Sequence, residues 1–495
     1  MTTPSRAWVR AIRPLSVVGG AAAATVALTV APWQIVVGAP TAGAPSTATS
    51  PHLVPLRASA LHCPGPETEG LAGVPPVTGG TTTVYAATAP AAALDNVALA
   101  DGPGVLAVTA TPPGGPLGQT TSRGAVVTAG LTGSVAGEVA ATGSLASGLA
   151  ALQTWTKLDS DDRGLVATPC LAPSSEMWLI AGGGEPTRRE RLVVANPGGN
   201  AATVDVSVFG AAGAIAAQGG SRLAVPPRGR SVVLLDAIAG GEASPVVRVV
   251  ASGGLVTAVI EDSWIDGAVA RGRDDAAPSA APAVDQVIPG VAIDGPALVR
   301  VFVPGSAEAI VQARLLTPTG PTAFPANAVT RVPGGTVRDI PIDGVAPGTY
   351  AVQLTADHPI VAAALVHRRP DAAAPSDLAW SASTPPIETL AGTPLPPSSR
   401  AVLAVSSSGG PADVTLVIVG PDGAATTKPV HVEADGVVTT DVSGAGAVWV
   451  RTTATGVRAA VTLDLADPAG TLISSVGLRS AAVSATEVPV HEVRR

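Results

Sequence analysis

Charged and aromatic residues are scarce in this chain of 495 residues. Asp, Glu, Lys and Arg together make up 13% of it, Phe, Trp and Tyr 2%, and the formal net charge is −8. Lysine occurs only at Lys157 and Lys428. Proteins that bind nucleic acid phosphates need dense Lys and Arg, so the composition argues against a nucleic-acid partner. The low charge density favours neutral partners over anionic polymers.

Glycine and proline are abundant instead, with 56 and 47 residues, and apolar residues still reach 46%. Frequent Gly and Pro argue against long helices and coiled coils. The apolar fraction argues against disorder, because it is enough to form hydrophobic cores. With about 100–150 residues for each domain, the length accommodates three or four domains.

The N-terminus has the features of an export signal. Three arginines lie in the basic tail 1–13, and no charged residue follows until beyond Thr49. The most apolar part of this stretch is about 23 residues long, enough to cross a bilayer as a helix. We predict a signal anchor over 14–38, with a cytoplasmic tail before it and the bulk of the chain outside the membrane. Cleavage near Ala39 or Ala44, which would give a secreted protein, is the alternative.

One β unit recurs three times at a period near 105 residues. The segment that begins at Val204 returns at Val311 and again at Val414, with offsets of 107 and 103. Each copy alternates apolar and polar residues with period two, and turns rich in Gly, Pro and Asp separate the alternating runs. In 204–208, for example, we expect the valines to face a core and the polar residues to face solvent.

Seven short strands fit the first copy, near 178–181, 190–195, 202–209, 221–225, 230–235, 246–251 and 255–262. This number of strands in about 95 residues is typical of an immunoglobulin-like sandwich. A β-propeller, the alternative, would need blades of about 40–50 residues. We therefore predict an all-β protein of tandem antiparallel immunoglobulin-like β-sandwich domains, three in number or four, after the N-terminal helix.

Domain boundaries follow from the three copies and from composition. A linker of Ala, Pro, Ser and Thr over 39–60 precedes an N-terminal β region over 61–176. This region is either a divergent fourth sandwich or strands with a weak helix over the Ala/Gly/Ser-rich stretch 130–151. The remaining chain divides into sandwich 1 over 177–270, a linker over 271–286, sandwich 2 over 287–380, a linker over 381–399 and sandwich 3 over 400–495.

Cys63 and Cys170 are the only cysteines. Two cysteines in an exported chain are expected to pair, here closing a loop of 107 residues. The chain-entropy model gives such a bond about 4–5 kcal/mol of stabilisation. Both cysteines lie next to proline, at opposite ends of the N-terminal β region. Without CxxC spacing they indicate no metal site or thiol nucleophile.

Two segments superficially suggest metal binding. The run 159–164 is similar to the start of a calcium loop, but Arg163 occupies its fifth position and Cys170 its twelfth. His431 and Glu433 share one face of a strand without a second pair of ligands at a usable spacing. The six histidines are scattered singly. We predict no metal site.

Catalytic motifs are also missing from the sequence. It contains no GxSxG, HExxH, Walker-type or strand-following GxGxxG motif. Glu261 and Asp262 are adjacent on a strand and point to opposite faces, so this pair alone cannot form the facing carboxylates of a glycoside hydrolase. We predict no catalytic residue, no cofactor and no enzymatic activity.

Five tryptophans stand out in a chain so poor in aromatics. Exposed indole rings would suit stacking on sugar rings, and these residues are the candidate binding surface. Packing in cores or between domains is the favoured interpretation, because three of the five lie near boundaries between copies. The five are Trp155, Trp178, Trp264, Trp380 and Trp449.

Several loose motifs are similar to those of a known family. After the anchor and spacer, 62–67 reads His-Cys-Pro-Gly-Pro-Glu, and the second cysteine precedes Trp178. The run 191–197, Arg-Leu-Val-Val-Ala-Asn-Pro, leads into 202–206, Ala-Thr-Val-Asp-Val. The combination resembles the actinobacterial envelope proteins called domain of unknown function 5719, over most of the chain after about residue 55.

Copies two and three depart from the Asn-Pro element of this family, since 303–305 and 406–408 occupy the corresponding place. The resemblance implies an uncharacterised exported protein without assigned catalytic residues, often encoded near glycosyltransferase and mannose-phosphate genes. We expect a non-enzymatic envelope scaffold or adaptor outside the cytoplasmic membrane, with an envelope glycan or protein as partner and a link to glycan assembly. A wall-polysaccharide-binding protein is the alternative, and a glycan-active hydrolase is a further one.

Overall fold

The computed structural model describes residues 52–68, 71, 76–112, 114–159, 162–216, 219–324, 328–368 and 373–487. Antiparallel strands form nearly all of its regular structure, which confirms the all-β prediction. The helical elements of these residues are one short α-helix and two single-turn 3-10 helices. The predicted basic tail and anchor, 1–38, lie outside the described ranges. Within those ranges, no helix is long and apolar enough to span a bilayer.

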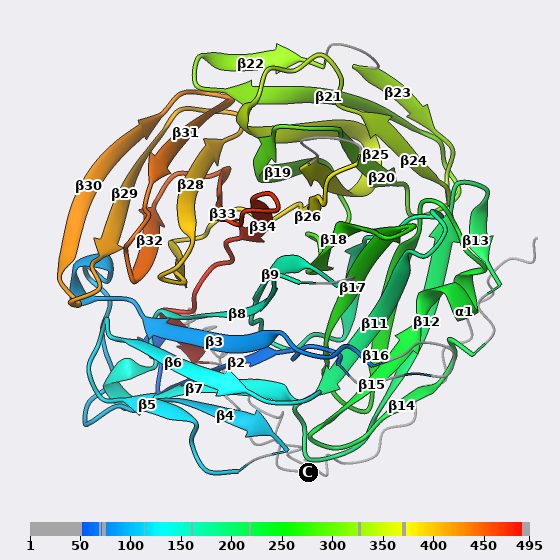
Figure 1. Ribbon diagram of the computed structural model, residues 1–495. Helices are drawn as coiled ribbons and strands as arrows, with labels where there is room; N and C mark the ends of the chain where they lie inside the picture. The colour runs from blue at the N-terminus through cyan, green and yellow to red at the C-terminus, as the bar shows by residue number, and fades with distance from the viewer. Residues whose placement is uncertain are drawn as a thin grey trace, which may run out of the picture. The chain divides into compact units, whose positions relative to one another are not determined.

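Four successive groups of strands, which we call repeats A to D, share one sheet order (Figure 1). In each repeat the first, sixth, third and fourth main strands form one sheet, and the fifth, second, seventh and eighth form the other. Repeat A has β2 (Ala58–Cys63), β7 (Ala136–Thr142), β4 (Leu106–Thr111) and β5 (Gly118–Thr120) in one sheet, and β6 (Val126–Leu131), β3 (Thr81–Thr88), β8 (Leu149–Lys157) and β9 (Gly164–Pro169) in the other. Its 3-10 helices are η1 (Ala91–Ala93) and η2 (Gly143–Leu145).

Repeat B repeats this order with additions at one edge. Its first sheet has β10 (Glu176–Ile180), β16 (Val246–Ser252), β12 (Ala202–Gly210) and β13 (Gly213–Ile215), with β14 (Leu223–Val225) also paired to β12. Its second sheet has β15 (Gly229–Leu234), β11 (Arg189–Asn196), β17 (Thr257–Asp266) and β18 (Val269–Ala276). The helix α1 (Leu235–Ala239) follows β15.

In repeat C the sixth and seventh strands are one continuous strand, β25 (Gly348–Arg368), so the two sheets are joined. The first part of β25 pairs with β19 (Ala283–Ile293) and β21 (Ala309–Thr317), and β21 also pairs with β22 (Gly320–Ala323) and β23 (Val329–Val332). Its second part pairs with β20 (Ala297–Phe302), which pairs with β24 (Val337–Pro341), and with β26 (Asp377–Ala382).

Repeat D has the plainest form of the order. One sheet contains β27 (Leu390–Pro394), β32 (Ala447–Thr452), β29 (Ala412–Val419) and β30 (Ala425–Val432). The other contains β31 (Gly436–Asp441), β28 (Arg400–Ser407), β33 (Val457–Leu465) and β34 (Leu472–Gly477). Beyond repeat D, β35 (Ser484–Glu487) pairs with β1 (His52–Pro55), so the two ends of the described chain form one two-stranded sheet.

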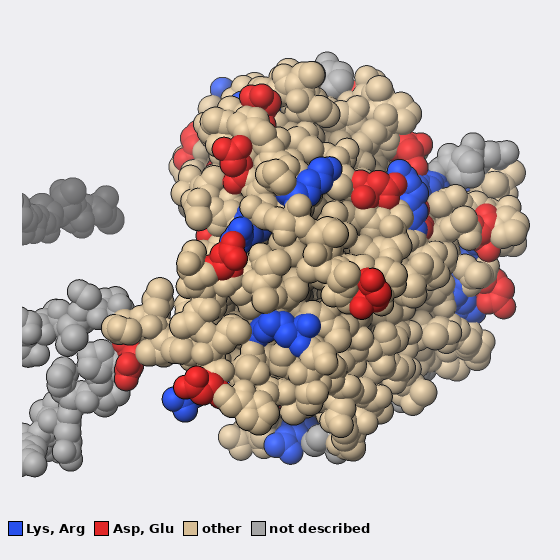
Figure 2. All heavy atoms as spheres, turned by 90° about the vertical axis from the view of Figure 1, so that its left-hand side faces the viewer, with Lys and Arg blue, Asp and Glu red and all other residues tan. Residues whose placement is uncertain are grey.

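The hydrophobic cores come from alternating strand residues. In β12, Val204, Val206 and Val208 are buried, while Asp205 and Ser207 between them are exposed, as the sequence predicts. Residues from both sheets of a repeat belong to one cluster, so the core lies between the two sheets. Charged side chains are few and scattered on the face that Figure 2 shows.

The eighth strands of the four repeats meet in the middle of Figure 1. We call β9, β18, β26 and β34 the central strands. Strand β9 lies against β18 and β34, and β26 lies against the same two, so the four strands contact one another in a cycle. Each is the last strand of its sheet.

Both predicted linkers are partly wrong. The linker 271–286 contains most of β18 and the start of β19, and 381–399 contains all of β27. The composition rule treats charge, Gly and Pro as signs of solvated loops. The charges of β18, however, are buried, and the proline that ends β27 is tolerated because β27 is an edge strand.

The N-terminal predictions also need correction. The spacer 39–60 includes β1 and the start of β2, while the part before residue 52 lies outside the described residues. The weak helix over 130–151 is not formed, because most of that stretch belongs to β6, β7 and β8. The N-terminal β region has the same sheet order as the other repeats, which accords with its interpretation as a divergent copy.

Candidate functional site

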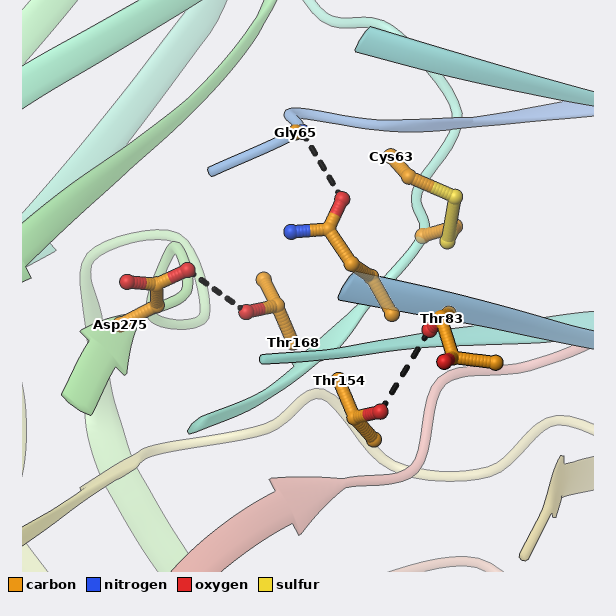
Figure 3. Close-up of a disulfide and its surroundings, with 8 residues drawn as sticks. Cys63, Gly65, Thr83, Thr154, Thr168 and Asp275 are labelled. Atoms are coloured by element: carbon orange, nitrogen blue, oxygen red, sulfur yellow. Dashed lines mark hydrogen bonds between the residues drawn. A yellow bond between two sulfur atoms is a disulfide. The ribbon is translucent and has the colours of Figure 1, made fainter. Parts of the chain in front are cut away.

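A disulfide joins Cys63 at the end of β2 to Cys170 just after β9 (Figure 3). It links the first strand of repeat A to the residue that follows its last strand. Next to it, the Gln153 side-chain oxygen accepts a hydrogen bond from the Gly65 backbone N–H at 2.8 Å. The Thr168 hydroxyl of β9 donates a hydrogen bond to Asp275 of β18 at 2.9 Å (Figure 3). We call the buried acids of the central strands, Asp274, Asp275 and Asp377, together with their hydrogen-bond partners, the polar centre.

One carboxyl group connects all four central strands. Asp377 of β26 is fully buried, and it accepts backbone N–H groups of Leu165 in β9, Arg273 in β18 and Ile473 in β34. The donor–acceptor distances are 3.5, 3.3 and 2.9 Å. Each of these N–H groups belongs to the last strand of its sheet, and among the described strands none pairs with the free edge of that strand. Because a buried N–H without a partner is costly, the Asp377 side chain replaces the missing strand.

Asp274 of β18 makes a second such connection. It accepts the Trp380 backbone N–H at 2.7 Å and the Ser474 hydroxyl at 2.9 Å. The Ser474 oxygen in turn accepts the Ala167 backbone N–H at 3.0 Å. Repeats A, B, C and D are therefore linked again, through a chain of buried hydrogen bonds. Contacts of this kind typically provide hydrogen-bond partners for the polar groups at strand edges. They are not typical of side chains that face a substrate.

Burial sets the ionisation of these acids. It raises the pKa of Asp377 to about 7 although backbone N–H bonds partly oppose the rise, and it raises that of Asp275 to about 7, with the nearby Glu261 adding to the effect. The pKa of Asp274 is well above its ordinary value for the same reason, despite its bonds to Trp380 and Ser474. The centre therefore holds protons that ordinary carboxyls would release near pH 4.

The adjacent acids of β17, Glu261 and Asp262, bind different arginines. Asp262 forms a two-pronged pair with Arg188 at 2.8 and 2.6 Å and accepts the Trp380 indole N–H at 2.7 Å. Burial alone would raise the pKa of Asp262, but Arg188 outweighs it and lowers that pKa. Glu261 pairs with Arg273 at 3.1 Å and accepts the Glu67 backbone N–H. Both carboxylates are thus engaged inside the protein.

The tryptophans lie mostly inside the protein, at contacts between repeats. Trp178 of repeat B packs on Phe302 of repeat C, with ring centroids 5.4 Å apart. The ring centroid of Trp155 in repeat A lies 4.3 Å from the guanidinium carbon of Arg273 in repeat B. Stacking on sugars needs exposed ring faces, which four of the five do not have, so the structure favours the packing interpretation. Those four are Trp155, Trp178, Trp380 and Trp449, and Trp264 is half-buried.

The weaker metal candidates remain isolated. His431 Nδ1 lies 2.7 Å from Asp413 on the exposed surface, and Glu433 is 3.8 Å from the other ring nitrogen. Within the described ranges, no group of three or more His, Cys, Asp or Glu residues has the geometry to hold a metal ion. Part of the 159–164 run lies outside the described residues, and Arg163 is buried against Asp467 at 2.9 Å.

A pocket of about 480 Å³ opens beside the polar centre, where the chain leaves three of the central strands. Its walls include Cys170 and Leu171 after β9, Ser279 after β18, and Leu478 and Arg479 after β34. Strands β2 and β8 of repeat A, β10 and β17 of repeat B, and β27 of repeat D complete it. The volume lies within the usual range for small-molecule sites.

The sequence did not single out the pocket or the polar centre. Asp274, Asp275 and Arg273 lay in the predicted linker, and Asp377 and Arg479 carried no motif. One signal was available for the centre: the run 271–275, Arg-Gly-Arg-Asp-Asp, is a dense charge cluster in a chain with 13% charged residues. The pocket combines residues of three repeats, so no local pattern marks it.

A family profile for proteins of unknown function, DUF5719, matches residues 125–443. The chain belongs to the DUF5719 family. The DUF5719 match begins just before β6 of repeat A, includes all of repeats B and C, and ends after β31 of repeat D. It therefore contains three central strands and Asp377, and it is narrower than the extent expected from the motifs. A comparison with curated proteins finds no match.

Proposed function

We propose that this chain is a non-enzymatic scaffold or adaptor of the cell envelope, exposed outside the cytoplasmic membrane. The observation that supports this proposal is that its buried acids are engaged in contacts inside the protein. Asp274 and Asp377 bond to backbone and side-chain donors of neighbouring repeats, while Glu261 and Asp262 are paired with arginines. Carboxyls engaged in this way hold repeats together and are not available for acid–base catalysis.

The proposal extends to the finer architecture and the location. Each repeat would be an immunoglobulin-like sandwich, and 14–38 would be the helix that anchors or exports the chain. The apolar stretch behind the arginines of 1–13 supports this orientation. The sparse surface charge supports a neutral partner, an envelope glycan or another envelope protein.

Location is tested by adding protease to intact cells stripped of their wall. A chain exposed outside the membrane is cleaved without lysis, and a cytoplasmic marker protein in the same sample is not. Protection of the chain until the cells are lysed would contradict the proposed location.

Partner binding is tested by co-sedimentation of the purified full chain with wall sacculi and wall polysaccharide of the native host, at low and high salt. Binding that persists in high salt supports contact with a neutral partner, because salt screens charge-driven adsorption. Competition by a defined glycan would favour the carbohydrate-binding alternative. The absence of sedimentation, together with an absence of crosslinked envelope neighbours in cells, would contradict the scaffold proposal.

A further inference from the structure

The central pocket contains one cation that no acid of the described chain pairs with. Arg479 lines the pocket and is partly buried, and its hydrogen bond in the described structure goes to the Pro278 carbonyl oxygen. Burial lowers the pKa of Arg479 to about 10, so the guanidinium still carries its charge at neutral pH. A guanidinium has five N–H donors, and the single bond to Pro278 leaves most of them for another acceptor.

Two further polar groups of the pocket walls are unsatisfied. Thr257 Oγ1 and Trp178 Nε1 are both buried, and neither has a hydrogen-bond partner among the described atoms. Buried donors without partners are rare, because each costs about 1–3 kcal/mol. These two atoms have almost no solvent-accessible surface, so a ligand in the pocket does not reach them, and Arg479 is the cationic donor that the pocket offers.

The rest of the wall is largely apolar. The other charged residue on it, Glu176, is exposed and paired with Arg248 at 2.9 Å. The hydroxyl of Ser279 also lines the pocket, but it donates within its own wall to a backbone carbonyl. The apolar side chains come from three repeats and include Leu61, Leu149, Met177, Ala258, Val476 and Leu478.

We propose that this pocket binds an amphiphilic anion, with a carboxylate or phosphate head at Arg479 and an apolar chain along the walls. The head group would accept hydrogen bonds from the guanidinium, where two parallel N–H···O bonds are available to either oxyanion. The chain would displace water from apolar surface, which supplies the remaining affinity. Fatty acids and alkyl phosphates share this chemistry.

The experiment uses the full chain in a neutral maltoside detergent and two photoreactive ligands, a diazirine-bearing dodecanoate and a diazirine-bearing dodecyl phosphate. Peptide mass spectrometry locates the labelled residues. We expect labels in 149–151 or 476–480, competed by the unmodified anion but not by dodecanol. The comparison of the two anions tells which head group is preferred, and equal labelling is compatible with their shared chemistry.

Variants separate the head-group contact from the cavity. Arg479→Gln is expected to weaken competition about tenfold to a hundredfold, the range for hydrogen bonds to a charged group. Arg331→Gln, which removes an exposed arginine paired with Glu308, is the matched control and should bind as wild type. Ala172→Trp, at an exposed position of the pocket wall, should block labelling without disturbing the core.

Thermal unfolding of every variant reports whether the fold is intact. If Arg479→Gln does not fold, Ala172→Trp still decides the question, since it is expected to block labelling. The proposal is overturned if neither anion labels the pocket. It is also overturned if dodecanol competes as well as the anions, or if folded Arg479→Gln labels like wild type.

Discussion

Replacement of Asp377 by alanine should destabilise the whole assembly of repeats. The change leaves three buried N–H groups, on β9, β18 and β34, without an acceptor. A buried donor without a partner costs about 1–3 kcal/mol. Only the bond from Ile473 is short, at 2.9 Å, so the other two count at the low end of that range. The gross loss is about 3–5 kcal/mol.

Part of this loss is offset. Burial raises the pKa of Asp377 to about 7, which means that the site disfavours the carboxylate, and its removal relieves that cost. At pH 5, about one unit above the ordinary aspartate pKa, this offset is about 1 kcal/mol, so we expect a net destabilisation of about 2–4 kcal/mol. At pH 7 the offset rises to about 4 kcal/mol and nearly cancels the loss, so the measurement is made at pH 5. Asp377→Asn keeps one acceptor oxygen but places an NH₂ group near the strand donors, so its effect should lie between those of wild type and Asp377→Ala.

Urea unfolding followed by tryptophan fluorescence measures the change, because Trp380 is on the same central strand as Asp377. Asp205→Ala is the matched control. Asp205 also accepts a backbone N–H, from Arg222 at 2.9 Å, but it is exposed, and water can replace it. The reasoning is refuted if Asp377→Ala unfolds at the same urea concentration as Asp205→Ala and the wild type.

Three further predictions concern pH, the disulfide and a buried ion pair. The pKa values of Asp275 and Asp377 are about 7 in the folded chain and about 4 in the unfolded chain, so the folded state binds protons more tightly. The stabilisation that protonation of these two acids provides is complete below pH 4. This contribution is lost as pH rises through 7, so the thermal midpoint should be higher at pH 5 than at pH 8; a higher midpoint at pH 8 would contradict it. Reduction of the Cys63–Cys170 bond should lower unfolding stability by about 4–5 kcal/mol, as urea titration with and without reductant can measure, and unchanged stability would argue against the chain-entropy account. Arg188→Met leaves its carboxylate partner buried and unpaired and should cost about 3–5 kcal/mol in the same assay, whereas a neutral result would show that water or another cation reaches the site.

The sequence was sufficient for strands with one buried and one solvated face. The alternation of β12 placed Val204, Val206 and Val208 correctly, and the copies at Val311 and Val414 occupy the same position in β21 and β29. Period-two alternation works there because the strand separates a core from solvent. The repeat length of about 105 residues follows from the same pattern.

The central strands break that assumption. Neighbouring repeats cover β18, so its polar residues are buried among partners that are distant in sequence. Arg273, Asp274 and Asp275 therefore resemble a solvated linker by composition although all three are buried. Their partners lie between 12 and 206 positions away, such as Glu261 and Glu67. No local rule could connect these residues before the repeats were placed together.

Some of the few charged residues of this chain are buried where the four similar repeats meet. Repeats with one sheet order and similar apolar cores could pair with the wrong neighbour, since hydrophobic burial is non-directional. The polar partners differ from strand to strand: Asp377 lies on β26, Asp274 on β18, and Ser474 on β34. A wrong order would leave buried carboxyls and N–H groups unpaired, at several kcal/mol each time. The polar centre thus favours a single order of the repeats, and the arginines that pair or pack around it are correspondingly buried, namely Arg163, Arg188, Arg191, Arg271, Arg273 and Arg300.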